Sequence, residues 1–172
     1  GWTYTYRQKG ISHKKFFEEE FGPHIEIVET YTKGKVVYLA CRVISIPENK
    51  NVEVYKGYTF AVVVLINYKR NDMYNFGYKD MEESMHPYYY DCPEKILDIL
   101  SNPISESAAE WRKKCRERLA KPKLNNGMIV QTTESIRFSD GATSNKFYIE
   151  KGKNIVRIVS DITGNITSQR YR

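Results

Sequence analysis

The longest uninterrupted run of apolar residues in this chain is seven residues long, from Phe60 to Ile66 (FAVVVLI). A helix that crosses a membrane needs about 20 such residues. The run is therefore too short to span a membrane, and its length is typical of a buried strand. We expect a soluble protein built around a sheet, with no membrane among its partners.

The residues around this run predict more strands and the helices that cover them. Ser12 and Ser105 are suited to cap two helices, and Pro93 is suited to the first turn of a third. The expected helices cover residues 12–21, 94–100 and 105 to about 120, and the expected strands cover 2–7, 25–32, 35–46 and 58–68. The predicted fold class is α+β, with an antiparallel sheet and packed helices across residues 1–121.

The last third of the chain has a different character. Residues 122–127 (PKLNNG) are polar and rich in turn formers, which predicts a linker. Beyond them, short strands are expected at 128–133, 134–138, 147–150, 155–160 and 165–171. Short strands at this spacing predict a small all-β subdomain over residues 128–172, either an SH3-like β-barrel or a β-meander.

Cysteine usage and glycine motifs limit the chemistry that the chain can perform. Cys41, Cys92 and Cys115 are single and widely spaced, which argues against a disulfide framework and against a zinc site. The default location is then a reducing cytoplasm. The sequence contains no GxxxxGK or GxGxxG loop, so nucleotide hydrolysis has no visible machinery. We expect no cofactor, no metal and no catalytic residue.

The segment from Tyr74 to Pro93 (YNFGYKDMEESMHPYYYDCP) concentrates aromatic and acidic residues. Exposed tyrosines offer flat faces that stack on bases or anchor protein interfaces. The candidate ligand-binding or partner-binding residues are Tyr78, Lys79, Asp80, Glu83, His86, Tyr88, Tyr89 and Tyr90. The alternative is structural: the acids pair with Lys79 or cap a turn, the tyrosines pack inward, and the segment docks helices onto the sheet.

A run of basic residues from Arg112 to Lys123 (RKKCRERLAKPK) follows on the longest predicted helix. Apolar residues recur at helical spacing from Ala108 to Leu119, so this stripe is expected to face inward. Lys113, Lys114, Arg116 and Lys121 are then expected to project outward. An exposed basic face is typical of phosphate contacts. The candidate nucleic-acid contacts are Arg112, Lys113, Lys114, Arg116, Arg118, Lys121 and Lys123. A solvated helix and an acidic protein partner are the alternatives.

The string FGYKDMEESMHPYYYDCP resembles a motif of the form WGYKDMDESMGPYYYDCP. That motif occurs in a family of uncharacterised small proteins encoded by bacteriophages, plasmids and integrative elements, chiefly of gut and Gram-positive bacteria. The first residues, Gly-Trp-Thr, and the string at 136–141 (IRFSDG) followed by Phe147 are also similar to that family. The resemblance implies a mobile-element setting in bacteria and no established activity. His86 and Phe76 replace a usual Gly and a usual Trp.

Three functions follow as hypotheses. The first is a non-enzymatic binding module that contacts nucleic acid through the basic helix; helix, three strands and helix is the order of a double-stranded RNA binding domain, an analogy of fold order alone. The second is an inhibitor that binds a host defence or regulatory protein, so the possible protein partners are those of the host or of the element. The third is an enzyme with a cleft beside residues 74–93, in which Lys79, Asp80, Glu83 and His86 converge.

Overall fold

The computed structural model describes residues 1–5, 12–48, 55–70, 73–84, 86, 89–150 and 155–172. The chain divides into two compact units, Gly1–Lys121 and Pro122–Arg172. The first unit combines helices with an antiparallel sheet, and the second unit is an antiparallel sheet alone. The chain as a whole is therefore α+β. Among the residues that are described, no helix combines the length and the apolar character needed to cross a membrane.

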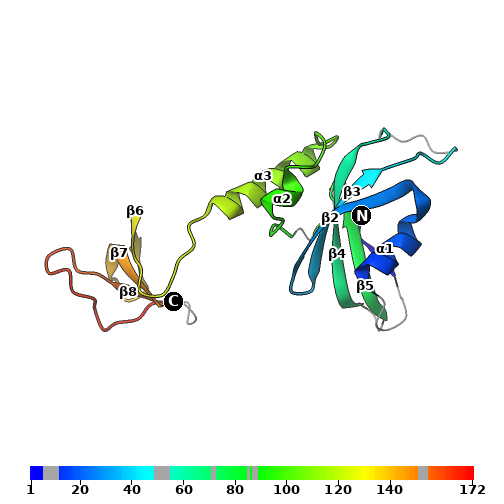
Figure 1. Cartoon of the computed structure of the whole chain (residues 1–172). Coiled ribbons are helices and arrows are strands. Elements are labelled where there is room, and N and C mark those ends of the chain that lie inside the picture. The colour runs from blue at the N-terminus through cyan, green and yellow to red at the C-terminus, as the bar shows by residue number, and fades with distance from the viewer. Residues whose placement is uncertain (6–11, 49–54, 71–72, 85, 87–88, 151–154) are drawn as a thin grey trace. The chain divides into compact units, whose positions relative to one another are not determined.

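The first unit contains one five-stranded antiparallel sheet in the order β1-β5-β4-β3-β2 (Figure 1). The elements in chain order are β1 (Thr3–Thr5), α1 (His13–Phe21), a 3-10 turn (Gly22–His24), β2 (Ile25–Lys33), β3 (Val36–Val43), β4 (Thr59–Arg70), β5 (Met73–Asp80), α2 (Glu94–Leu97) and α3 (Glu106–Ala120). The Ser12 side chain accepts a hydrogen bond from the Lys15 amide, and that of Ser105 accepts one from the Ala108 amide. Both predicted helix starts are therefore confirmed.

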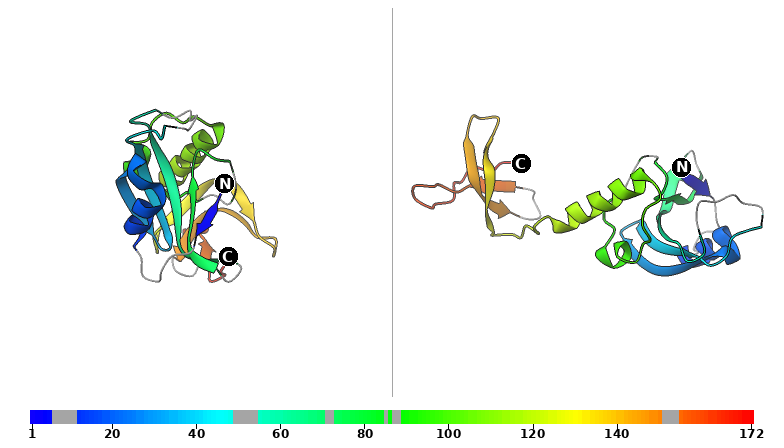
Figure 2. Two further views of the ribbon diagram at one scale, coloured as in Figure 1. Left: turned by 90° about the vertical axis from the view of Figure 1, so that its right-hand side faces the viewer. Right: turned by 90° about the horizontal axis from the view of Figure 1, so that it is seen from above.

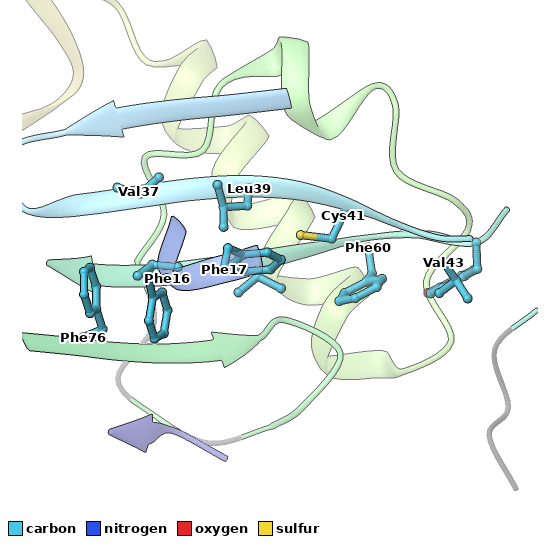
Figure 3. Packing of buried hydrophobic residues seen from close by; sticks show 11 residues of the cluster. Phe16, Phe17, Val37, Leu39, Cys41, Val43, Phe60 and Phe76 are labelled. Carbon is cyan, nitrogen blue, oxygen red and sulfur yellow. The ribbon is translucent and has the colours of Figure 1, made fainter. Parts of the chain in front are cut away.

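One face of this sheet packs against α1. Alternate residues of a strand point to opposite faces, and on β3 the side chains of Val37, Leu39 and Cys41 are all directed toward the α1 side (Figure 3). Phe16 and Phe17 of α1 fill the centre of this cluster and are fully buried. Burial of a phenylalanine side chain contributes about 1.5–3 kcal/mol, so these two side chains hold α1 to the sheet.

The opposite face of the sheet packs against α2 and α3 (Figure 2). Tyr38 and Ala40 of β3 lie on this face, where they meet Trp111 of α3. Strand β4 is the middle strand of the sheet and is covered on both sides. Coverage on both faces explains why the run from Phe60 to Ile66 carries no alternating polar residues.

Two expectations for the first unit are wrong. The first half of the Tyr74–Pro93 segment is strand β5, which was not predicted. Four strands therefore separate α1 from α2, rather than the three of a double-stranded RNA binding domain. Gly77 of β5 lies against the Tyr4 ring of β1. A β-carbon at this position would be 2.9 Å from that ring, which is too close for any larger residue. This glycine lets β1 pair with β5.

The second unit contains a three-stranded meander in the order β6-β7-β8. Its strands are β6 (Ile129–Arg137), β7 (Thr143–Glu150) and β8 (Ile155–Ile158). The predicted SH3-like barrel is not present, because the described strands form an open sheet and the segment expected at 165–171 pairs only through isolated bridges at Ile166 and Tyr171. The two strands expected at 128–138 are one strand with a register shift between Gln131 and Ile136.

Candidate binding surface around helix α3

Glu82 joins the sheet to the start of α3. One of its carboxylate oxygens accepts a hydrogen bond from the Tyr58 hydroxyl at 2.6 Å and pairs with Arg112 Nη2 at 3.2 Å. The other oxygen accepts from the backbone amides of Ile104 and Ser105 at 3.1 and 3.2 Å. These amides lie at the positive end of the α3 dipole, where a carboxylate is stabilising. We call this set the Glu82 junction.

Arg112 belongs to the Glu82 junction and is not a surface cation. Its side chain is 7% exposed, and Nη1 donates to the carbonyl oxygen of Ser101. Ala108, Arg112 and Cys115 are all buried and are spaced four and three residues apart, so position 112 falls on the inward stripe of the helix. Arg112, a candidate nucleic-acid contact by sequence, is therefore a buried member of the junction, and both of its Nη atoms are engaged inside the protein.

Three other basic residues of α3 are paired with acids. Arg116 lies 3.1 Å from Glu94 and 3.5 Å from Asp98. Arg118 lies 2.8 Å from Asp91, and Lys114 lies 3.5 Å from Glu110. Exposed pairs of this kind contribute about 0–1 kcal/mol each. Their charge is still partly offset, which reduces the field that α3 presents to a polyanion.

Lys113, Lys121 and Lys123 are exposed, and no ion pair is formed by any of the three within the parts of the chain that the structure describes. They are the members of the predicted set whose charge is not offset. Leu119, expected on the inward stripe, is 47% exposed because the last turn of α3 lies beyond the buried face. Lys121 and Lys123 therefore follow an exposed end of the helix, whereas Lys113 lies in the middle of α3.

The candidate residues of the Tyr74–Pro93 segment lie on different sides of the sheet. Tyr78 faces α1, where its hydroxyl donates to Glu20 at 2.8 Å and its ring packs against Phe16. Tyr89 is half-buried, and its carbonyl oxygen accepts a hydrogen bond from Trp111 Nε1 at 2.8 Å. Tyr88 lies outside the described residues. Tyr78 and Tyr89 thus do not share one stacking surface.

Lys79 and Asp80 are structural. Lys79 is fully buried and donates to the carbonyl oxygen of Glu83, and burial lowers its pKa. Asp80 Oδ1 accepts a hydrogen bond from the Glu82 amide at 2.9 Å. Burial raises the pKa of Asp80 to about 6. These contacts hold the turn after β5 in the shape that delivers Glu82 to α3.

We expect Asp80→Asn to stabilise the protein at neutral pH by about 1–2 kcal/mol, because it removes a buried charge while keeping an acceptor for the Glu82 amide. The folded-state pKa of about 6 exceeds the ordinary value of 3.8. The stability of the unmodified protein should therefore fall as pH rises between these values, and level off above them. Urea denaturation across this pH window measures both effects; a variant less stable than the parent at neutral pH would contradict the assignment.

His86 and Tyr90 line a groove of about 310 Å³ with residues of α3. The Lys114 ammonium lies 5.7 Å from the centre of the Tyr90 ring, at cation–π distance. The remaining lining residues are Glu106, Ser107, Glu110 and Trp111. Lys79, Asp80 and Glu83 are absent from this lining, so the four polar groups of the enzyme hypothesis do not converge here. This groove is where the tyrosine segment meets the basic helix.

The second unit is the more basic part of the chain. Residues 122–172 contain eight Lys and Arg against four Asp and Glu, an excess of +4 out of the formal +6 of the whole chain. Arg157 and Arg170 both pair with Glu150. The rings of Phe138 and Tyr171 are stacked, with their centroids 3.9 Å apart. The Tyr171 hydroxyl donates a hydrogen bond to Asp140 at 3.0 Å. The IRFSDG string therefore supplies part of this unit's packing.

The comparisons with known proteins give one match. Residues 102–172 match the family model of a domain of unknown function, DUF6927. No curated protein and no solved structure matches the chain. The matched region takes in α3 and the whole second unit, which are also the regions that hold Lys113, Lys121 and Lys123. The chain is thus similar, over this part, to a family without an assigned activity.

Sequence reasoning missed Tyr58 and Glu82 as residues of the junction. Glu82 stands inside the tyrosine-rich motif, but nothing in the sequence distinguishes it from Glu83, which is exposed. The difference arises only when β5 delivers Glu82 to the start of α3. The sequence signal for Glu82 is its position, two residues after the end of β5 and before the capped helix α3. Many surface carboxylates share such a position, so this signal does not single out Glu82.

Proposed function

We propose that this protein is a non-enzymatic nucleic-acid-binding protein. The observation that carries the proposal is the division of the basic run into paired residues, which secure α3, and three exposed lysines, Lys113, Lys121 and Lys123, with no ion pair among the described residues. Unpaired lysines release condensed counterions when they meet phosphate, which is the main source of affinity for nucleic acid.

The charge of the second unit supports the same partner. Its excess of +4 adjoins Lys121 in the sequence, so the cationic stretch continues beyond the helix. Net positive charge on a small unit attracts polyanions and speeds their association. The contact is with the sugar-phosphate backbone, and no base-specific contact is proposed.

The setting that we propose is a bacterial mobile element. It rests on the similarity of the residue 76–93 string to the motif of phage, plasmid and integrative-element proteins. In that setting the nucleic acid is that of the element or of its host. The match to a domain of unknown function is compatible with this proposal and does not test it.

Replacing Lys113, Lys121 and Lys123 together by Gln should weaken binding to a labelled DNA duplex by at least about tenfold at low salt, because three phosphate contacts are lost. Fluorescence anisotropy with the duplex and with a single strand of the same sequence measures the change. A control of equal charge change replaces Lys14, Lys15 and Lys56, which are also exposed, by Gln; of these, Lys14 and Lys15 are paired with Glu18 and Glu19. Equal losses in both variants would mean that net charge alone governs binding and would overturn the assignment of these lysines.

A protein partner is the second candidate. One observation favours it: the second unit leaves several large apolar side chains exposed for its size, namely Leu124, Met128, Ile129, Ile136, Ile162 and Ile166. Exposed apolar groups gather at protein interfaces. Capture from a host lysate with and without nuclease distinguishes the two candidates, since a partner retained after nuclease treatment is bound through protein.

A further inference from the structure

The sheet of the second unit has one face that the core of the unit does not use. On β7, the middle strand, Phe147 and Ile149 are buried, whereas Lys146, Tyr148 and Glu150 are only half-buried. Successive residues of a strand point to opposite faces of the sheet. Phe147 and Ile149 therefore mark the core face, and the residues that alternate with them mark an open face.

The strand register gives the neighbours of Tyr148 on this open face. Residues directly opposite each other in an antiparallel pair lie on the same face. Tyr148 is opposite Ile129 of β6 and Arg157 of β8, and Lys146 is opposite Gln131 of β6. Ile129 is 52% exposed. We call these five residues the Tyr148 face.

The Tyr148 side chain is available for a partner. Within the parts of the chain that the structure describes, its ring makes no aromatic contact and its hydroxyl makes no hydrogen bond. The hydroxyl lies near Gly127, 3.7 Å from where a β-carbon of that residue would stand, so the ring leans across the start of β6. The other aromatic rings of the unit are engaged, because Phe138 contacts both Phe147 and Tyr171.

The charge around Tyr148 is positive. Glu150 lies on the same face and pairs with both Arg157 and Arg170, so two cations share its one negative charge. Lys146 forms no ion pair with any residue that the structure describes. A polyanion therefore meets three cations and one acid here. An unoccupied aromatic ring among cations is the combination with which proteins bind single strands of nucleic acid.

We propose that the Tyr148 face binds single-stranded nucleic acid. A base stacks on the Tyr148 ring and the adjoining Ile129 side chain, and the neighbouring phosphates contact Lys146 and Arg157. The bases of a single strand can be splayed out onto such a ring, whereas those of a duplex are stacked within it. Stacking tolerates any base, since every base has a flat face.

This inference rests on the proposed function and adds to it the form of nucleic acid and the residue that receives a base. The two contacts are independent in kind. Lys113, Lys121 and Lys123 meet phosphate, which a duplex and a single strand both offer, whereas Tyr148 requires an unpaired base. Removing the bases of a strand while keeping its phosphates therefore isolates the contribution of Tyr148.

The test is fluorescence anisotropy of the full chain with a short oligothymidylate and with an abasic oligonucleotide of the same length. The unmodified protein should bind the oligothymidylate at least about fivefold more tightly. Tyr148→Ala should bind the two equally, and Tyr148→Phe should keep the preference because the hydroxyl is not used. Tyr55→Ala, which removes an exposed tyrosine of the first unit, is the control and should keep it too.

Equal binding of both oligonucleotides by the unmodified protein overturns the proposal, and this result needs no variant, so it does not depend on the folding of Tyr148→Ala. A base preference that persists in Tyr148→Ala overturns it as well. A dimer in sedimentation that Tyr148→Ala dissociates, without base-dependent binding, assigns the face to a second copy of the chain instead. Duplex binding that is lost on replacing Lys113, Lys121 and Lys123 by Gln leaves the proposed function standing in each of these cases.

Discussion

Glu82→Ala is expected to lower the free energy of unfolding by about 3–5 kcal/mol, because it leaves the buried Arg112 guanidinium without its counterion. The loss also removes the acceptor of the Tyr58 hydroxyl and of two amides at the start of α3. Glu82→Gln should cost less, since the amide oxygen still accepts hydrogen bonds, yet it too leaves Arg112 uncompensated. Urea denaturation followed by tryptophan fluorescence measures both.

Glu48→Ala is the matched control for the junction, because Glu48 is exposed and forms no ion pair with any residue that the structure describes. Its effect should stay within about 0.5 kcal/mol. If Glu82→Ala were as mild as this control, the carboxylate would not be holding α3 to the sheet. The tyrosine-rich motif would then need a different explanation.

Trp111→Ala should be of similar severity, at about 3–5 kcal/mol. The side chain is 1% exposed and is packed among residues of β3, β4 and α2, and its Nε1 donates to Tyr89 at 2.8 Å. Trp111→Phe should cost less, because most of the packing survives and only the hydrogen bond and part of the ring are lost. Thermal and urea denaturation of both variants give the two values.

Leu119→Ala provides the comparison on the same helix. Leu119 was expected on the inward stripe with Trp111, but it is 47% exposed, so its replacement should cost less than about 1 kcal/mol. Comparable losses at the two positions would show that the last turn of α3 is buried in solution, contrary to this structure.

Local sequence signals predicted the starts of α1 and α3 well, whereas α2 ends at Leu97 rather than at residue 100. Ser12 and Ser105 cap their helices through side-chain hydrogen bonds that depend on neighbouring residues alone. The hairpin at Lys33-Gly34 is also local, and Gly34 adopts a φ of 63° that favours glycine. Strand β5 was not predicted although Tyr74, Phe76 and Tyr78 alternate with polar or small residues, because the alternation ends at Asp80 and residues 74–93 as a whole show no single period.

The candidate site was harder to predict because its charges are decided by distant residues. The run from Arg112 to Lys123 has a strongly positive local charge, but Arg116 and Arg118 meet acids contributed by residues 91–98. The predicted inward stripe did not include Arg112, which the structure buries beside Ala108 and Cys115. Strand closure in the second unit was likewise unpredictable, because barrel formation depends on pairing between the ends of the sheet rather than on any single strand.

The salt dependence of nucleic-acid binding tests the central claim most directly. Plotted as log affinity against log salt concentration, the slope for the unmodified protein should be steeper by about 2–3 than for the variant in which Lys113, Lys121 and Lys123 are Gln. Between about 50 and 200 mM salt, this difference amounts to roughly fifteenfold to sixtyfold in relative affinity. Identical slopes for the two proteins would contradict the account. So would a failure of the unmodified protein to bind nucleic acid at low salt.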